Sequence, residues 1–141
     1  MSTRPSYKTF VMERQVAAPR AEVWHQLLSL IGAAGYAVEG DPPPHGPGAT
    51  LAFSLGDFEL VEKTLSLEPP WRRCYEVTEG APVALYQGTT IIRDDGPTCL
   101  LVWSYLADPG DHAGADAFLE RAQQALRTAT ERVAQAAEAT T

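Results

Sequence analysis

The order of hydrophobic and polar positions along the chain predicts a strand, a helix, a run of strands and a long final helix. Apolar and polar residues alternate over residues 7–16, the spacing of a half-buried strand. The same alternation returns in later segments, at residues 36–38, 50–55, 58–67, 71–78, 85–93 and 98–107. Apolar residues recur three and four apart over residues 19–31 and 113–137, which indicates two amphipathic helices.

Turn-forming residues separate these segments. The Asp-Asp-Gly-Pro sequence at residues 94–97 predicts a hairpin between the last two strands. Gly32 and Gly35 are expected to end the first helix, because glycine tolerates the backbone of a helix C-terminus. Residues 41–48 contain three consecutive prolines and are expected to form a loop, since proline fits neither a helix interior nor a central strand.

These elements predict an α+β fold. A one-faced sheet and an amphipathic helix each have an apolar face to bury, and the simplest arrangement buries them against each other. A helix of about 25 residues laid across a bent antiparallel sheet can enclose a cavity between the two. We expect residues 1–141 to form a single domain with its core at about residues 7–137.

Composition and charge narrow the classes of partner. The 141 residues carry a net charge of −7, which argues against nucleic acid and against an anionic membrane surface, since both require clustered positive charge. The first residues contain no apolar core of a signal peptide, and no apolar run reaches the length of a membrane span. We therefore expect a cytoplasmic protein in which Cys74 and Cys99 are reduced thiols, with an interstrand disulfide as the alternative.

Three stretches resemble the START-like (SRPBCC) superfamily, and within it the bacterial polyketide cyclase/dehydrase and lipid-transport group. They are Arg-Gln-Val-Ala-Ala-Pro at residues 14–19 followed by Val23-Trp24, Tyr-Glu-Val-Thr-Glu-Gly at 75–80, and the segment from Leu101 to Gly110. The resemblance implies a helix-grip fold, a curved antiparallel sheet wrapped around the long C-terminal helix with an internal cavity. The prolines at positions 42–44 and 47 depart from the family pattern.

The resemblance also implies which side chains face the cavity. Alternation places Trp103 and Tyr105 on one face of the last strand, and the resemblance turns that face toward the long helix. The implied ligand-binding residues are Tyr75, Thr90, Trp103 and Tyr105 on the strands and Phe118, Ala122 and Leu126 on the helix. The alternative is that the aromatic residues are ordinary core residues whose polar atoms have found partners.

Glu62 is the most informative candidate, because an inward-facing carboxylate must be paired or protonated. One interpretation is a salt bridge with Arg73 across the sheet, and another is a register that leaves Glu62 in solvent. The functional interpretation makes Glu62 either a polar anchor for a ligand carbonyl or hydroxyl group, or a general base. In the second case Tyr86 or Arg73 would stabilise the developing charge on an oxygen. Such chemistry requires no cofactor. The three histidines are scattered and no cluster has metal-ligand spacing, so no metal site is predicted.

Two functions remain open at this stage. One is a cyclase or dehydratase acting on an apolar, polyketide-like intermediate. The other is a non-catalytic protein that binds or carries a lipid or another hydrophobic small molecule, with residues 41–48 as a lid or as part of the cavity mouth. An interaction module is a third and weaker interpretation. A homodimer through an edge strand or the first helix is compatible with the sequence, which does not require one.

Overall fold

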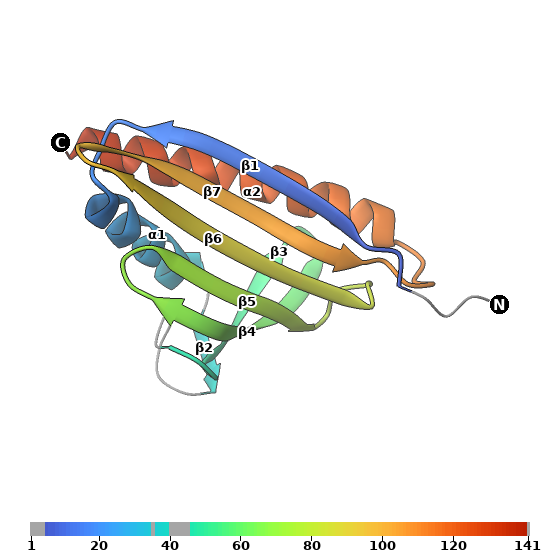
Figure 1. The fold of residues 1–141 in the computed structure, drawn as a ribbon. Helices are drawn as coiled ribbons and strands as arrows, with labels where there is room; N and C mark the ends of the chain where they lie inside the picture. Colours follow the sequence, from blue (N-terminus) through green and yellow to red (C-terminus); the bar gives the residue numbers. More distant parts are fainter. Residues whose placement is uncertain (1–4, 35, 40–45, 141) are drawn as a thin grey trace.

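A computed structural model describes residues 5–34, 36–39 and 46–140, and its elements follow the predicted order (Figure 1). The strands are β1 (Lys8–Val16), β2 (Tyr36–Glu39), β3 (Thr50–Leu55), β4 (Phe58–Glu68), β5 (Arg72–Glu79), β6 (Leu85–Asp95) and β7 (Thr98–Asp108), and the helices are α1 (Arg20–Ala34) and α2 (Ala115–Ala139). Most predicted boundaries fall within two residues of these.

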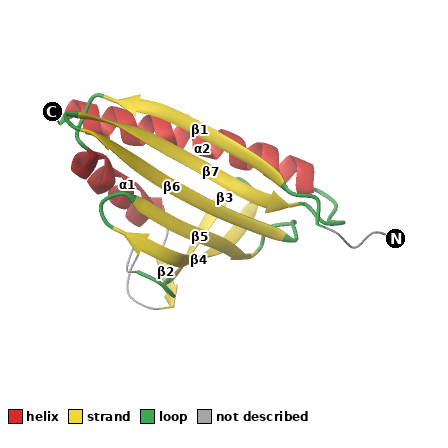
Figure 2. Cartoon of the chain, in the orientation of Figure 1, coloured by secondary structure: helices red, strands yellow, loops and turns green. Residues whose placement is uncertain are grey.

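The strands form one antiparallel sheet in the order β1-β7-β6-β5-β4-β3-β2. Strands β2 to β7 are sequential neighbours, and β1 joins the sheet beside β7, so the first and last strands of the chain pair with each other. The sheet curves around α2, which runs along its inner face, while α1 lies near the C-terminal end of α2 (Figures 1 and 2). The predicted helix-grip fold is confirmed.

The apolar stripe of α2 is buried against the inner face of the sheet. Phe118, Ala122, Leu126 and Val133 are each 5% exposed or less, as their three- and four-residue spacing predicts. The strand faces are also as predicted, because Tyr75, Thr90, Trp103 and Tyr105 are all buried. The core therefore lies between α2 and the concave side of the sheet.

Arg14 fastens the edge strand β1 to α2, a contact that the sequence interpretation did not include. Its Nε donates to Glu131 Oε1 (2.9 Å), and its two Nη atoms donate to the carboxylate of Glu138 (2.8 and 3.1 Å). The backbone N–H of Ala17 also donates to Glu138 (2.9 Å). Hydrogen bonds from Arg14, and then from Ala17, hold the pKa of Glu138 at about 2. Glu131 and Glu138 lie two turns apart on the side of α2 that meets β1, so both can bind the same arginine.

The end of α1 differs from the prediction. The helix continues through Gly32 to Ala34, so Gly32 is an interior helical residue. Gly35 and residues 40–45, which include most of the predicted loop and His45, lie outside the described residues. The chain resumes in a turn at residues 46–48, where the N–H of Gly48 donates to the carbonyl of Thr64 on β4 (2.9 Å).

The sequence also led us to expect reduced cysteines and no membrane-spanning segment. Cys74 and Cys99 are both free thiols, as predicted. Among the described residues, neither helix combines the length and the apolar character needed to cross a membrane.

Candidate functional site

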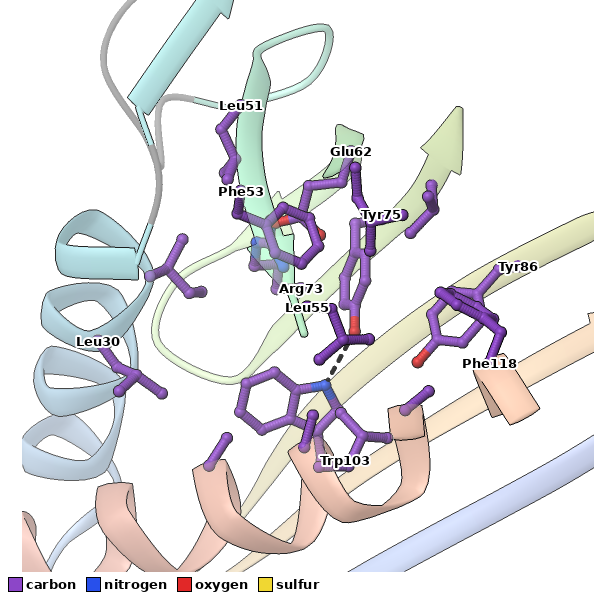
Figure 3. Close-up of a pocket in the computed structure, with 17 residues that line it drawn as sticks. Leu30, Leu51, Phe53, Leu55, Glu62, Arg73, Tyr75, Tyr86, Trp103 and Phe118 are labelled. Carbon is purple, nitrogen blue, oxygen red and sulfur yellow. Dashed lines mark hydrogen bonds and ion pairs between the residues drawn. The ribbon is translucent and has the colours of Figure 1, made fainter. Parts of the chain in front are cut away.

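A cavity of about 200 Å³ lies between the concave face of the sheet, α2 and the end of α1 (Figure 3). Its wall comes from six elements in addition to α2. The lining residues are Leu30, Ile31, Leu51, Phe53, Leu55, Leu60, Glu62, Arg73, Tyr75, Val77, Tyr86, Trp103, Phe118, Ala122, Ala125, Leu126 and Ala129. The wall is therefore aliphatic and aromatic, apart from one charged pair and the polar atoms of three aromatic side chains.

Local sequence features explain the space. The face of α2 that covers the cavity presents Ala122, Ala125 and Ala129, whose side chains are too short to fill the concave sheet. On the opposite wall, the pairing of β4 with β5 shifts register at residues 61–62 and again at 64–66. Such bulges increase twist and re-aim side chains, and these two flank the stretch that turns Glu62 and Thr64 inward.

Glu62 and Arg73 form a buried ion pair in the cavity wall. Nη2 of Arg73 donates to Oε1 of Glu62 at 3.0 Å, and the two side chains are 1% and 9% exposed for Arg73 and Glu62 respectively. The sequence alternative of a salt bridge across the sheet is thus what the structure contains. Burial raises the pKa of Glu62 above its ordinary value, although Arg73 acts in the opposite direction.

The guanidinium of Arg73 has further contacts and one unused donor. Its Cζ lies 4.6 Å from the centroid of the Tyr75 ring, a cation–π arrangement that offsets part of the cost of burial. Among the described residues, Nε of Arg73 and Oγ1 of the neighbouring Thr90 are buried without a hydrogen-bond partner. The sheet around Arg73 therefore keeps unused hydrogen-bonding capacity.

Tyr75 and Trp103 are joined by a buried hydrogen bond from Nε1 of Trp103 to the hydroxyl of Tyr75 (3.1 Å; Figure 3). The Tyr75 side chain reaches β7 by crossing β6 at Gly88. A Cβ atom on Gly88 would lie 2.0 Å from Cζ of Tyr75, so glycine is required at this position. A lone glycine inside an otherwise regular strand is the sequence signal for such a close approach, and the sequence interpretation did not use it.

Tyr86 is held between two other aromatic rings. Its centroid lies 5.1 Å from that of Tyr105 and 5.8 Å from that of Phe118, the latter edge-to-face. Its hydroxyl points toward the cavity, on the side where the hydroxyl of Tyr75 lies (Figure 3). Burial raises the pKa of Tyr75 to about 12 and that of Tyr86 higher still, so both are neutral phenols at physiological pH.

The structure brings most of the predicted site residues together. Lining the cavity are Glu62, Arg73, Tyr75, Tyr86, Trp103, Phe118, Ala122 and Leu126. The two predicted residues that do not line it are Thr90, which lies in register between Arg73 and Trp103, and Tyr105. Tyr105 packs behind Tyr86 and accepts a hydrogen bond from Nε2 of Gln123 on α2 (3.1 Å).

The sequence interpretation missed one wall of the cavity. Leu51, Phe53 and Leu55 on β3, with Leu30 and Ile31 on α1, close the end away from β7. Alternation in β3 was a usable signal, but it does not reveal how far the sheet bends over the cavity. No cluster of three or more histidine, cysteine, aspartate or glutamate side chains suited to a metal ion occurs within the described ranges.

Comparisons with known proteins identify the fold. No family model matches the chain, and no curated protein sequence matches it. Among solved structures, Ara h 8.0201 has a TM-score of 0.73 at 14% identity, covering 92% of this chain and 97% of that one. A norcoclaurine synthase point mutant from Thalictrum flavum, in complex with a transition-state analogue, also has a TM-score of 0.73, at 19% identity, covering 99% and 100%.

A second structure of norcoclaurine synthase from Thalictrum flavum contains dopamine and hydroxybenzaldehyde. Its TM-score is 0.68 at 19% identity, and the match covers 93% of this chain and 86% of that one. All three structures share the arrangement of a curved antiparallel sheet around a long C-terminal helix, so they agree with the helix-grip fold of this chain. At such identities the likeness concerns the fold, and it does not single out the polyketide cyclase group.

The buried pair yields a prediction about stability. Arg73→Met leaves the Glu62 carboxylate buried without a counter-charge, which typically costs about 3–5 kcal/mol. Without the guanidinium the pKa of Glu62 should rise further from its ordinary value of 4.5. The folded variant then holds a proton that the unfolded chain releases, so its free energy of unfolding should fall as the pH rises above that value. Urea unfolding at a series of pH values measures both effects.

The double variant Glu62→Leu/Arg73→Met is the matched control. It removes both charges, so it should lie within about 2 kcal/mol of the wild type and should lack the added pH dependence. If Arg73→Met and the wild type have the same urea midpoint of unfolding at every pH tested, the account is wrong.

Proposed function

We propose that the protein binds a small, largely apolar molecule of one or two rings between the sheet and α2. The premise is its helix-grip fold, which encloses a small cavity. The observation that carries the proposal is the cavity of about 200 Å³ with its aliphatic and aromatic lining. Cavities of this kind bind apolar molecules because little ordered water has to be displaced from polar partners.

The cavity volume limits the size of the ligand. An engineered cavity of about 150 Å³ binds benzene, whereas pockets for drug-sized ligands measure about 300–1,000 Å³. A cavity of about 200 Å³ lies near the lower of these values. The volume therefore favours a compact molecule over an extended polyketide chain or a long-chain lipid, which would require the wall to move.

The proposed cavity leads to a prediction about ligand binding. Ethylbenzene and acetophenone should bind to the wild type, as detected by isothermal titration calorimetry or by line broadening in ligand NMR spectra. Ala125→Phe places a ring in the cavity and should weaken binding of both compounds by at least about 10-fold, which corresponds to about 1.4 kcal/mol.

The control for this variant is Ala117→Phe, which makes the same substitution on the exposed face of α2 and should leave both affinities unchanged. Circular dichroism shows whether each variant is folded. If folded Ala125→Phe binds both compounds as tightly as the wild type, the ligand does not occupy this cavity. If the wild type binds neither compound, the proposed function is wrong.

A second candidate function is acid–base catalysis on the bound molecule, and a specific observation favours it. Glu62 faces the cavity with a raised pKa, beside Arg73 and with Tyr86 on the same wall. In this proposal Glu62 removes a proton from the carbon next to a carbonyl, and Arg73 or Tyr86 stabilises the negative charge that develops on the carbonyl oxygen. Such a step begins a cyclisation or a dehydration, the chemistry that the superfamily resemblance suggested, and it needs no cofactor.

Exchange of the methyl protons of acetophenone in D₂O tests this step. The wild type should accelerate loss of the methyl signal in ¹H NMR spectra, and Glu62→Gln should abolish the acceleration. Because only the ionised carboxylate is a base, the rate should rise with pH above the ordinary carboxyl value of 4.5. If bound acetophenone exchanges its methyl protons no faster than free acetophenone, Glu62 is not a base in this reaction. Binding alone would then be the function.

A further inference from the structure

We infer that the ligand carries a neutral hydrogen-bond acceptor, a carbonyl oxygen in its simplest form, which the hydroxyls of Tyr75 and Tyr86 receive together. The inference rests on the proposed binding function and specifies the chemical class of the ligand. Both side chains line the cavity, and their hydroxyl groups lie on the same side of it near the indole of Trp103 (Figure 3). Within the part of the chain that the structure describes, no other lining residue carries a hydroxyl group.

The hydrogen-bond donors of Trp103, Tyr75 and Tyr86 lack one acceptor among the residues around them. Trp103 can only donate, and its N–H is taken by the oxygen of Tyr75 (3.1 Å). Two hydroxyl protons remain, those of Tyr75 and Tyr86. The two phenols interact with each other, but such an interaction takes up only one of these protons. At least one hydroxyl donor therefore faces the interior of the cavity, where an unmet donor costs about 1–3 kcal/mol.

The cavity wall around these two hydroxyl groups offers few hydrogen-bond acceptors. The nearest rings, Phe118 and Tyr105, contribute aromatic carbon, and the hydroxyl of Tyr105 is already bonded to Gln123 outside the cavity. A ligand carbonyl oxygen has two lone pairs, so it can accept from both tyrosines at once when it replaces the contact between the two phenols. The missing partner is thus an acceptor, and a ligand hydroxyl would add a further donor to satisfy.

The two donors are held in place before any ligand arrives. The Tyr75 ring is fixed between the Arg73 guanidinium (4.6 Å) and the glycine-only position at Gly88, and its oxygen is bonded to Trp103. The Tyr86 ring is fixed between Tyr105 and Phe118. Donors that are already oriented recognise an acceptor without a further loss of side-chain entropy, which favours selectivity for a particular oxygen position.

The electrostatics favour a neutral acceptor over an anion. The charge of Glu62 is among the causes that raise the pKa of both Tyr75 and Tyr86. The two hydroxyl groups therefore already lie in the field of one negative charge. The guanidinium that would balance a second anion is bonded to Glu62. A ligand carboxylate would therefore add a buried negative charge with no free counter-charge, whereas a ketone, an aldehyde or an amide would not.

Infrared spectroscopy of acetophenone labelled with ¹³C at the carbonyl tests the inference. Hydrogen bonding lowers the carbonyl stretching frequency, so the bound probe should absorb at a lower frequency than it does in hexane. Tyr86→Phe and Tyr75→Phe should each move the band part of the way back. Each should also weaken acetophenone binding by about 2- to 12-fold, the effect of one net hydrogen bond, with ethylbenzene binding little changed.

Tyr105→Phe is the matched control. It removes a hydroxyl group from the same aromatic cluster, but Tyr105 does not line the cavity. It should leave the carbonyl band and both affinities unchanged. If both compounds bind and the band of bound acetophenone equals that in hexane, or if neither Tyr75→Phe nor Tyr86→Phe moves it, the inference is wrong and the binding function stands. If neither compound binds, the binding function itself fails.

Discussion

The concave face of the sheet presents more apolar surface than α2 can cover, and the rest of the structure follows from this mismatch. The helix buries its stripe against β1 and β7, where Arg14 fastens it through Glu131 and Glu138. Farther across the sheet it offers mostly alanine, and the remaining surface is closed by β3 and α1 instead. A cavity is left because none of these elements carries side chains long enough to fill the centre.

The buried Glu62–Arg73 pair is costly in such a place. Removing two charges from water is expensive, and apolar residues of similar volume often give equal or greater stability. A pair retained in the wall of an otherwise apolar cavity is therefore better explained by a role toward a ligand than by stability. The adjacent hydroxyls of Tyr75 and Tyr86 supply the directional donors that an ion pair alone does not provide. In the binding function that we propose, these groups select a small molecule by one polar atom.

Sequence alone predicted the order of the elements, because periods of two and of three to four residues are visible without a structure, and the superfamily resemblance chose the inner face of each central strand. It also placed Glu62 and Arg73 on the same face and offered their salt bridge as one interpretation. It could not foresee that Tyr105 would lie behind Tyr86, which ring packing decides, or that Thr90 would not line the cavity. The contribution of β3 depends on sheet curvature, to which the bulges in β4 contribute.

Arg14 and Gly88 illustrate the same limit. Arg14 occupies an inward position between Met12 and Val16, and only the arrival of two carboxylates from α2 makes that position favourable for a charge. Gly88 is needed because one particular tyrosine crosses it. Both depend on contacts between residues far apart in the chain, which periodicity does not encode.

The central claim, that an apolar cavity lies between the sheet and α2, is tested most directly by X-ray diffraction from crystals of the protein held under xenon pressure. Xenon enters apolar cavities and scatters strongly, so its position is unambiguous. The account predicts a strong xenon peak bounded by Phe53, Trp103 and Leu126. Side chains that close the space, or xenon bound only elsewhere, would contradict it.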